Sequence, residues 1–246
     1  YTYDAVNRLT RAETTDNAWG QAFGYDGFGN LTSKTETKGS APSFSLSFDP
    51  SLNLPVGSQA PSHVPAGWDG MYDVENRLLD DGPTLYSYDP NGKRIKRKTV
   101  DECEFTFYGL SGERLATYSC DGDLEARNVY FAGKPVTFDG VAVKTDRLGS
   151  VRVSGTERLN YYPYGEEIGS SAERREKFAT YFRDDNNQDY ADQRYYRVGT
   201  GRFTMPDPAG LAVPRHDEPT SWNRFLYTTA DPVNRTDENG LCDVLL

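Results

Sequence analysis

The sequence is short of the residues on which many enzymes and membrane proteins depend. Its 246 residues include two His, three Cys and two Met. No apolar run approaches the roughly 20 residues of a membrane-spanning helix, so we expect no membrane span. No CxxC, HExxH, calcium-loop or glycine-rich phosphate motif occurs, so we expect neither a metal nor another cofactor. The net charge of −10 argues against a nucleic-acid partner, because phosphate neutralisation needs clustered Lys and Arg.

Two further absences concern processing and catalysis. The chain opens on Tyr1 without a Met or an apolar leader, so we expect it to be a piece of a longer polypeptide. His63 and His216 both lie in Pro-rich sequence without a recognisable nucleophile nearby, so we expect surface histidines and no Ser-His or Cys-His site.

Aromatic and turn-forming residues are abundant instead. The chain has 17 Tyr and 12 Phe together with 23 Gly and 14 Pro. This composition predicts a mainly β protein of short strands joined by tight turns.

An internal repeat supports this prediction. Its pattern is Tyr-Asp, two variable residues, Gly or Asn, a polar residue, and then Leu or Ile, and it occurs at 3–9, 25–31, 72–78 and 88–95. We interpret each copy as a β-hairpin in which Asp opens the turn through a side-chain hydrogen bond and Gly or Asn supplies a positive φ. Degenerate copies lie at 107–115, 130–136 and 146–152.

Two segments depart from the repeat. Residues 39–70 are rich in Gly, Pro and Ser, and we expect a long loop or a poorly paired excursion there. Residues 170–177 begin with Ser170 and continue with good helix formers, which predicts one short helix.

The repeat resembles that of the YD-repeat family, which includes Rhs proteins, the C subunits of insecticidal toxin complexes and, distantly, teneurins. The end of the chain resembles the Rhs repeat-associated core domain through an ordered series of motifs: Tyr195-Tyr196, Gly201-Arg202-Phe203, Pro206-Asp207-Pro208-Ala209-Gly210-Leu211, Asn223-Arg224-Phe225-Leu226-Tyr227, Asp231-Pro232-Val233-Asn234 and Asp237-Glu238-Asn239-Gly240-Leu241.

The resemblance implies an architecture and a function. The hairpins are expected to stack into a curved, spiralling sheet, a partial shell, with one or two short helices. We expect a repeat region at 1–140 and a core at 141–246. In the family such a shell encapsulates a C-terminal toxin, as in polymorphic toxins. The expected partners are the missing upstream repeats, the C-terminal cargo, and toxin-complex or secretion-apparatus proteins. We expect the protein to be secreted, at the cell surface, or delivered by a secretion system.

The resemblance also implies an aspartyl self-cleavage site. Matched to the family motif, the catalytic aspartates are Asp207 and Asp237, and the bond that is cut joins Leu241 to Cys242. Two carboxylates close together do not both ionise easily, so one acts as acid while the other activates water. Arg202 is expected to orient a carboxylate or polarise the carbonyl, and Gly240 to leave the backbone beside the bond unobstructed.

The sequence departs from the family pattern in three places, which bear on the assignment of the cleavage site. Glu238 replaces the usual Pro and adds a third acid near the aspartates, while Arg197 stands where the family usually has Asp. The stretch Pro214 to Pro219 is interpreted as a loop insertion, which lengthens the spacing between the aspartates at little entropic cost. Neither catalytic aspartate is lost.

Alternatives stay open at this point. The two aspartates would only cap turns if the chain is a non-catalytic cell-surface module whose tyrosines bind carbohydrate or protein. A second cleavage route would use the Cys242 thiol to attack the Leu241 carbonyl. Cys103 and Cys120 flank a hairpin symmetrically, which allows a cross-strand disulfide; the alternative is two reduced, half-buried thiols.

Overall fold

The computed structural model describes residues 1–56, 71–169, 174–184, 188–208, 219–241 and 244–245. His63, His216 and Cys242 lie outside the described residues, as do most of the 214–219 insertion and parts of the 39–70 and 170–177 segments. No helix in the described part of the chain is long and apolar enough to cross a membrane.

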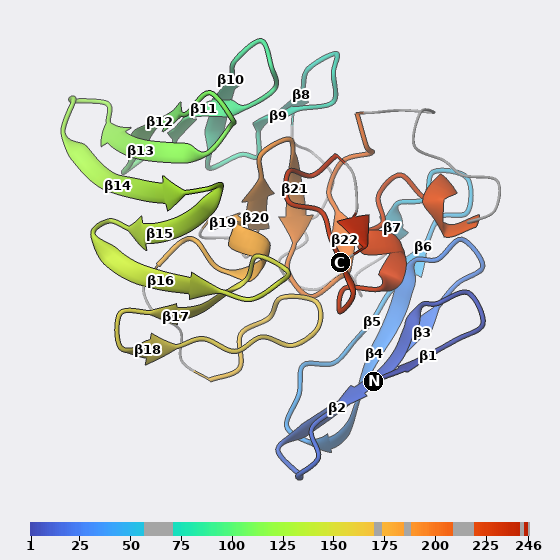
Figure 1. The fold of residues 1–246 in the computed structure, drawn as a ribbon. Helices are drawn as coiled ribbons and strands as arrows, with labels where there is room; N and C mark the ends of the chain where they lie inside the picture. The colour runs from blue at the N-terminus through green and yellow to red at the C-terminus, as the bar shows by residue number, and fades with distance from the viewer. Residues whose placement is uncertain (57–70, 170–173, 185–187, 209–218, 242–243, 246) are drawn as a thin grey trace.

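The middle of the chain forms an eleven-stranded antiparallel sheet, here called the central sheet, which curves around one side of the molecule (Figure 1). Its strands follow one another in chain order, so that every connection is a hairpin: β8 (Met71–Tyr72), β9 (Leu78–Asp80), β10 (Leu85–Tyr88), β11 (Arg94–Lys98), β12 (Cys103–Tyr108), β13 (Arg114–Ser119), β14 (Leu124–Phe131), β15 (Lys134–Phe138), β16 (Val141–Thr145), β17 (Val151–Ser154) and β18 (Glu157–Arg158). The prediction of a mainly β chain of stacked hairpins is confirmed.

A second sheet contains the N-terminal hairpins. It has five strands in chain order: β1 (Thr2–Tyr3), β2 (Leu9–Glu13), β3 (Trp19–Tyr25), β4 (Leu31–Gly39) and β5 (Phe44–Ser45). The described part of the 39–70 segment continues with a pair of two-residue strands, β6 (Ser47–Phe48) and β7 (Pro55–Val56).

The Tyr-Asp turns have the predicted geometry. The Asp89 carboxylate accepts hydrogen bonds from the backbone N–H groups of Asn91 and Lys93, at 2.9 and 2.8 Å, and Gly92 has a φ of +82°. Where Asn replaces Gly, as at Asn7 and Asn76, the φ is +62°. The side-chain bond and the positive φ therefore set the turn together.

Neighbouring repeats are also linked through their side chains. The Tyr88 hydroxyl donates to the carbonyl of Leu78 at 2.7 Å, and its ring packs against the Arg77 guanidinium at 5.3 Å. Tyr25 repeats both contacts in the N-terminal sheet, with Leu9 and Arg8. The regular spacing of the motif thus places each tyrosine on the turn residue of the preceding hairpin.

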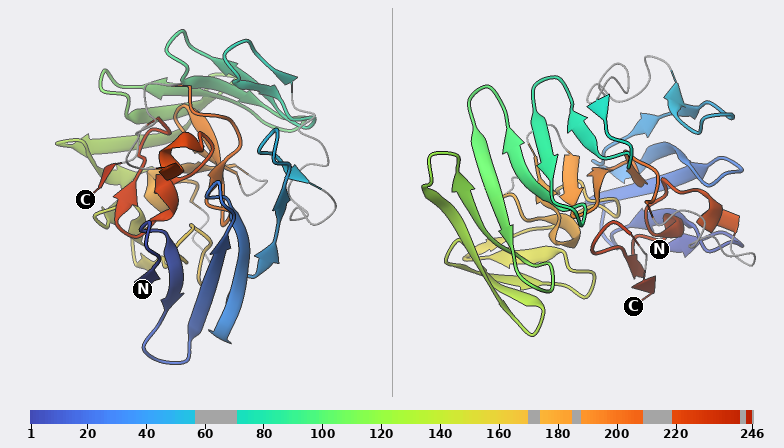
Figure 2. Two further views of the ribbon diagram at one scale, coloured as in Figure 1. Left: turned by 90° about the vertical axis from the view of Figure 1, so that its right-hand side faces the viewer. Right: turned by 90° about the horizontal axis from the view of Figure 1, so that it is seen from above.

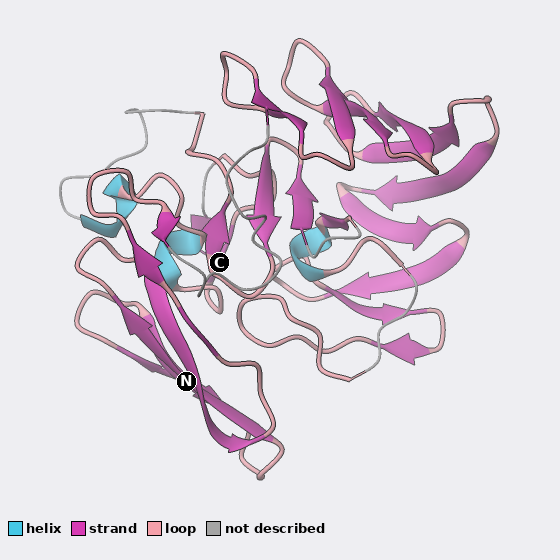
Figure 3. Ribbon diagram, turned by 180° about the vertical axis from the view of Figure 1, so that it is seen from behind, coloured by secondary structure: helices cyan, strands magenta, loops and turns pink. Residues whose placement is uncertain are grey.

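The C-terminal third lies within the curve of the central sheet, as Figure 1 and the view from above in Figure 2 show. It contains a four-stranded sheet, with a further pair of strands near the chain end that Figure 3 shows from behind. The strands are β19 (Phe182–Arg183), β20 (Gln188–Ala191), β21 (Arg194–Arg197), β22 (Arg202–Phe203), β23 (Arg235–Thr236) and β24 (Val244–Leu245), and the 3₁₀ turns are η1 (Phe178–Thr180), η3 (Pro219–Trp222) and η4 (Thr228–Ala230).

The helix predicted over 170–177 is wrong for its described part. Glu176 forms a β-bridge with Phe182, and the N–H of Lys177 donates to the carbonyl of Tyr181 at 3.1 Å. Arg175 forms an ion pair with Glu104 on β12 at 2.6 Å. These contacts with other elements override the local helix propensity.

Cys103 and Cys120 are joined by a disulfide with a Cα–Cα distance of 5.3 Å. We expect a denatured, non-reduced sample of the uncleaved chain to contain one free thiol, that of Cys242; three free thiols would contradict the bond. Because the bond closes 17 residues, replacing both cysteines by Ser is expected to lower the free energy of unfolding by about 3 kcal/mol in urea titrations.

Candidate functional site

Two buried aspartates meet at one arginine. Asp207 follows β22 and Asp237 follows β23, which places them at separate points of the C-terminal region. Nη2 of Arg194 lies 3.1 Å from Oδ2 of Asp207 and 3.0 Å from Oδ2 of Asp237. Because both oxygens lie within hydrogen-bond distance of one nitrogen, the two carboxylates are neighbours.

Arg194 is fixed from several directions. It stands on β21, where it is buried, and its guanidinium carbon lies 3.7 Å from the centre of the Phe203 ring. Nη1 donates to the carbonyl of Arg224 at 3.0 Å, and Nε donates to the carbonyl of Gly240. Burial lowers the pKa of Arg194, while Asp237 and Asp207 act in the opposite direction.

Arg194 and Asp237 also form hydrogen bonds with the backbone beside the expected cleavage point. Oδ1 of Asp237 accepts the N–H of Leu241 at 3.0 Å, and Arg194 binds the carbonyl of Gly240. These are the two polar groups of a single peptide unit. Gly240 has a φ of +70°, and a Cβ there would lie 2.7 Å from the carbonyl oxygen of Ala191. Only glycine therefore allows this approach.

A tyrosine hydroxyl binds the backbone of Asp237. The buried Tyr181 hydroxyl donates to the backbone carbonyl of Asp237. Burial raises the pKa of Tyr181 well above its usual value, so the hydroxyl keeps its proton and remains a donor at neutral pH.

A small cavity of about 40 Å³ opens onto the cluster. Arg194, both aspartates and Leu241 contribute to its wall, with the remaining wall formed by Thr220, Ser221, Asn223, Arg224, Leu226 and Thr229. A polar cavity needs roughly 10–15 Å³ to hold one water molecule, so this one has room for a water between the aspartates and Leu241.

Arg202 does not lie with the aspartates, contrary to the expectation. Its guanidinium donates to Oδ1 of Asn30 at 2.6 Å and to the carbonyl of Asn53, and it packs 4.2 Å from the Phe225 ring centre. Arg202 therefore connects the C-terminal region to the N-terminal sheet. Strand alternation and pairing direct it there, while the position it was expected to occupy belongs to Arg194.

Arg194 was not among the residues expected from the sequence, although one signal was present. It is directly followed by Tyr195-Tyr196 in a strand whose first three residues are buried. An arginine inside such an aromatic strand has to find carboxylates, because a buried charge is stable only when it is paired.

The remaining sequence-based expectations can be located in the structure. Glu238 is exposed. Nine of the 17 tyrosines are buried, so just over half of the tyrosines pack inside the protein. Among the described residues, no cluster of three or more His, Cys, Asp or Glu side chains has the arrangement of a metal site.

Comparisons with known proteins agree with the repeat and the fold. Residues 3–41 match the family described as RHS Repeat. The chain superposes on the crystal structure of TcdB2-TccC3-TEV with a TM-score of 0.70 and 19% identity, covering 98% of this chain and 15% of that one. It superposes on the Photorhabdus luminescens Tc holotoxin pore, with an aspartate-to-alanine mutant of TccC3, with a TM-score of 0.73 and 18% identity, covering 100% and 15%.

A third match is TcdB2-TccC3 without its hypervariable C-terminal region, with a TM-score of 0.69, 18% identity and coverage of 98% and 15%. This chain thus spans 15% of the length of the chains it matches. No curated relative matches the sequence.

The geometry predicts a large effect of removing Arg194. Arg194→Met leaves two buried carboxylates without their cation, and we expect the free energy of unfolding in urea to fall by about 3–5 kcal/mol. Adding Asp207→Asn and Asp237→Asn to that variant should restore part of the loss. Arg11→Met, which removes an exposed ion pair with Glu13, is the matched control and should change stability by less than about 1 kcal/mol. Equal effects of the two single variants would contradict the assignment.

Proposed function

We propose that this chain is the C-terminal part of a YD-repeat shell protein, because residues 3–41 match the RHS Repeat family and the fold superposes on a part of structures that contain TccC3. The shell encapsulates a C-terminal toxin and releases it by aspartyl self-cleavage after Leu241. The matched structures include a Tc holotoxin pore and a TcdB2-TccC3 complex without its hypervariable C-terminal region. This similarity supports toxin-complex proteins as partners and delivery outside the producing cell.

One observation carries the proposal. Asp207 and Asp237 share Arg194, and the Gly240–Leu241 peptide unit is bound on one side by Arg194 and on the other by Asp237. The bond from the Leu241 N–H to Asp237 has the same spacing as the turn bond from Lys93 to Asp89, but a turn cap alone does not need a cation shared with a second aspartate. The arrangement therefore favours a site built around the adjacent Leu241–Cys242 bond.

The chemistry is hydrolysis of the Leu241–Cys242 peptide bond. One carboxylate takes a proton from a water molecule in the cavity while the water oxygen attacks the Leu241 carbonyl carbon. The other aspartate, in its protonated form, gives its proton to the leaving nitrogen as the C–N bond breaks. The products are a carboxyl group on Leu241 and an amine on Cys242. Because substrate and catalyst belong to one folded chain, the reaction avoids the entropic cost of bringing them together.

Arg194 acts on the aspartates and on the substrate backbone. Its single positive charge lies between two carboxylates, so the cluster keeps one negative charge when both are ionised and becomes neutral when one is protonated. That balance permits one base and one acid side by side. Its bond to the Gly240 carbonyl fixes the residue that precedes Leu241.

The first test compares intact masses. The purified parent chain is expected to lose the mass of Cys-Asp-Val-Leu-Leu, whereas Asp207→Asn and Asp237→Asn should keep their full mass. Asp121→Asn, which changes an exposed turn residue, is the matched control and should be cleaved like the parent. Circular dichroism of each variant separates a lost reaction from a lost fold.

The same measurement decides between the competing hypotheses. Full-length mass in the parent as well as in the folded aspartate variants would contradict self-cleavage and leave the non-catalytic binding module. Cys242→Ala should be cleaved like the parent; its failure to be cleaved would instead favour attack by the Cys242 thiol.

A further inference from the structure

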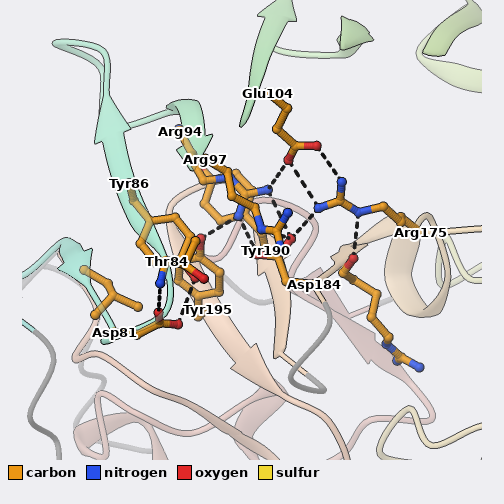
Figure 4. A network of polar contacts seen from close by, with 12 residues as sticks. Asp81, Thr84, Tyr86, Arg94, Arg97, Glu104, Arg175, Asp184, Tyr190 and Tyr195 are labelled. Carbon is orange, nitrogen blue, oxygen red and sulfur yellow. Dashed lines mark hydrogen bonds and ion pairs between the residues drawn. The ribbon is translucent and has the colours of Figure 1, made fainter. Parts of the chain in front are cut away.

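The central sheet has an unusual distribution of polar residues between its two faces. The face toward the C-terminal region carries buried charged and polar side chains on β11–β14, namely Arg94, Arg97, Glu104, Thr106, Arg114, Thr117 and Asn128. Figure 4 shows part of this network, in which Arg94 and Arg175 both bind Asp184. In most sheets with one solvated face the apolar side chains point toward the core, and here the order is reversed.

The opposite face is apolar and exposed. Phe107 is 55% exposed, Leu124 53% and Phe131 78%. Leu85 on β10 pairs with Lys98, and Val129 on β14 lies two residues after Arg127, so both belong to the same face, and both are exposed. The pairing of Lys96 with Phe105, and of Phe105 with Tyr118, places further aromatic rings on this face.

All charged residues on this face are cationic. Lys96, Lys98, Arg127 and Lys134 lie on it, and the pairing of Arg127 with Ala116, and of Ala116 with Phe107, gives the register. The two acids within strands β10–β15 are Glu104 and Glu125, and both contribute to a cavity on the opposite face. Among the described residues, none of the four cations forms an ion pair with a carboxylate. A protein with a net charge of −10 thus concentrates cations where it exposes apolar side chains.

We propose that this face, defined as the outward residues of β10–β15, docks onto membranes that contain anionic phospholipids. The cations complement the headgroups, and the exposed Phe, Leu and Val side chains enter the interface between headgroups and acyl chains. The apolar side chains are spread over several strands, with one ring contact between Phe107 and Tyr118, and two large cavities of the described residues are lined from other surfaces. Dispersed apolar side chains suit a lipid interface, whereas a bound peptide needs a groove.

The acidity of the whole chain does not prevent this docking. Exposed charges separated by more than a Debye length of about 10 Å at 0.1 M salt are largely screened. The membrane therefore responds mainly to the charges on the face that approaches it. The proposal is independent of the self-cleavage site.

Co-sedimentation with vesicles tests the proposal. The chain is incubated at about 0.1 M salt, where the Debye length is about 10 Å, with phosphatidylcholine vesicles, with or without added phosphatidylserine. We expect binding to the serine-containing vesicles alone, and loss of that binding at about 1 M salt, where the Debye length is about 3 Å. Lys98→Glu should weaken binding at least about fivefold. Phe131→Ser should weaken it without changing its salt dependence.

Arg11→Glu is the matched control, because it reverses one exposed charge on β2, away from this face. It should bind like the parent, and the circular dichroism of all three variants should be unchanged. The proposal is overturned if the parent does not bind the serine-containing vesicles, or if Lys98→Glu and Arg11→Glu behave alike. Binding to poly-glutamate without binding to vesicles would also overturn it, in favour of an acidic protein partner.

Discussion

Buried charge has to be neutralised inside this protein, and that requirement joins the central sheet to the C-terminal region. Strand β21 shows how. Alternation along the strand directs Arg194 toward Asp207 and Asp237, and the neighbouring Tyr195 toward the opposite side, where its hydroxyl accepts a hydrogen bond from Arg94 at 2.6 Å. The two faces of one short strand therefore serve the candidate site and the contact with the sheet. The placement of β21 therefore affects both the candidate site and the contact with the central sheet.

The contact between the central sheet and the C-terminal region consists partly of ion pairs. Asp184 is buried and forms ion pairs with Arg94 and Arg175, and burial raises its pKa while the arginines, Arg94 first, hold it below the usual value. Such a network contributes little net stability when intact but is costly to break, since one lost partner leaves a buried charge unmatched. It therefore favours one relative placement of sheet and C-terminal region over others. It also explains why the inward face of the sheet is polar, which leaves the apolar residues on the outside.

The hairpin turns are predictable because each depends on a few neighbouring residues. The placement of Arg194 and Arg202 and the conformation of residues 170–177 depend on contacts between distant segments, and the sequence analysis did not predict them. Tyr-Asp turns need only an Asp side chain and a positive φ a few residues later, so the hairpins and the mainly β class are predictable. The two aspartates were recognisable from their motifs, and the structure brings them together. Arg202 and Arg194 both lie in aromatic strands, and only the pairing of β21 with β22 and the path of the chain end decide which one reaches Asp237. The helix expected at 170–177 failed for the same reason, because long-range ion pairs determine the backbone there.

The anchors of the proposed site lie upstream of the bond to be cut. Arg194 and Asp237 hold the Gly240–Leu241 peptide unit. In the proposed cleavage these contacts would all stay on the upstream side of the cut, since each joins residues before Cys242. Beyond Leu241, the described contact with the shell is the pairing of β24 with β23, which consists of two residue pairs. Val244 is half exposed, so this short pairing adds little burial to hold the segment after Leu241. The geometry therefore suits a single self-cleavage that leaves the upstream fold intact and releases the segment after Leu241.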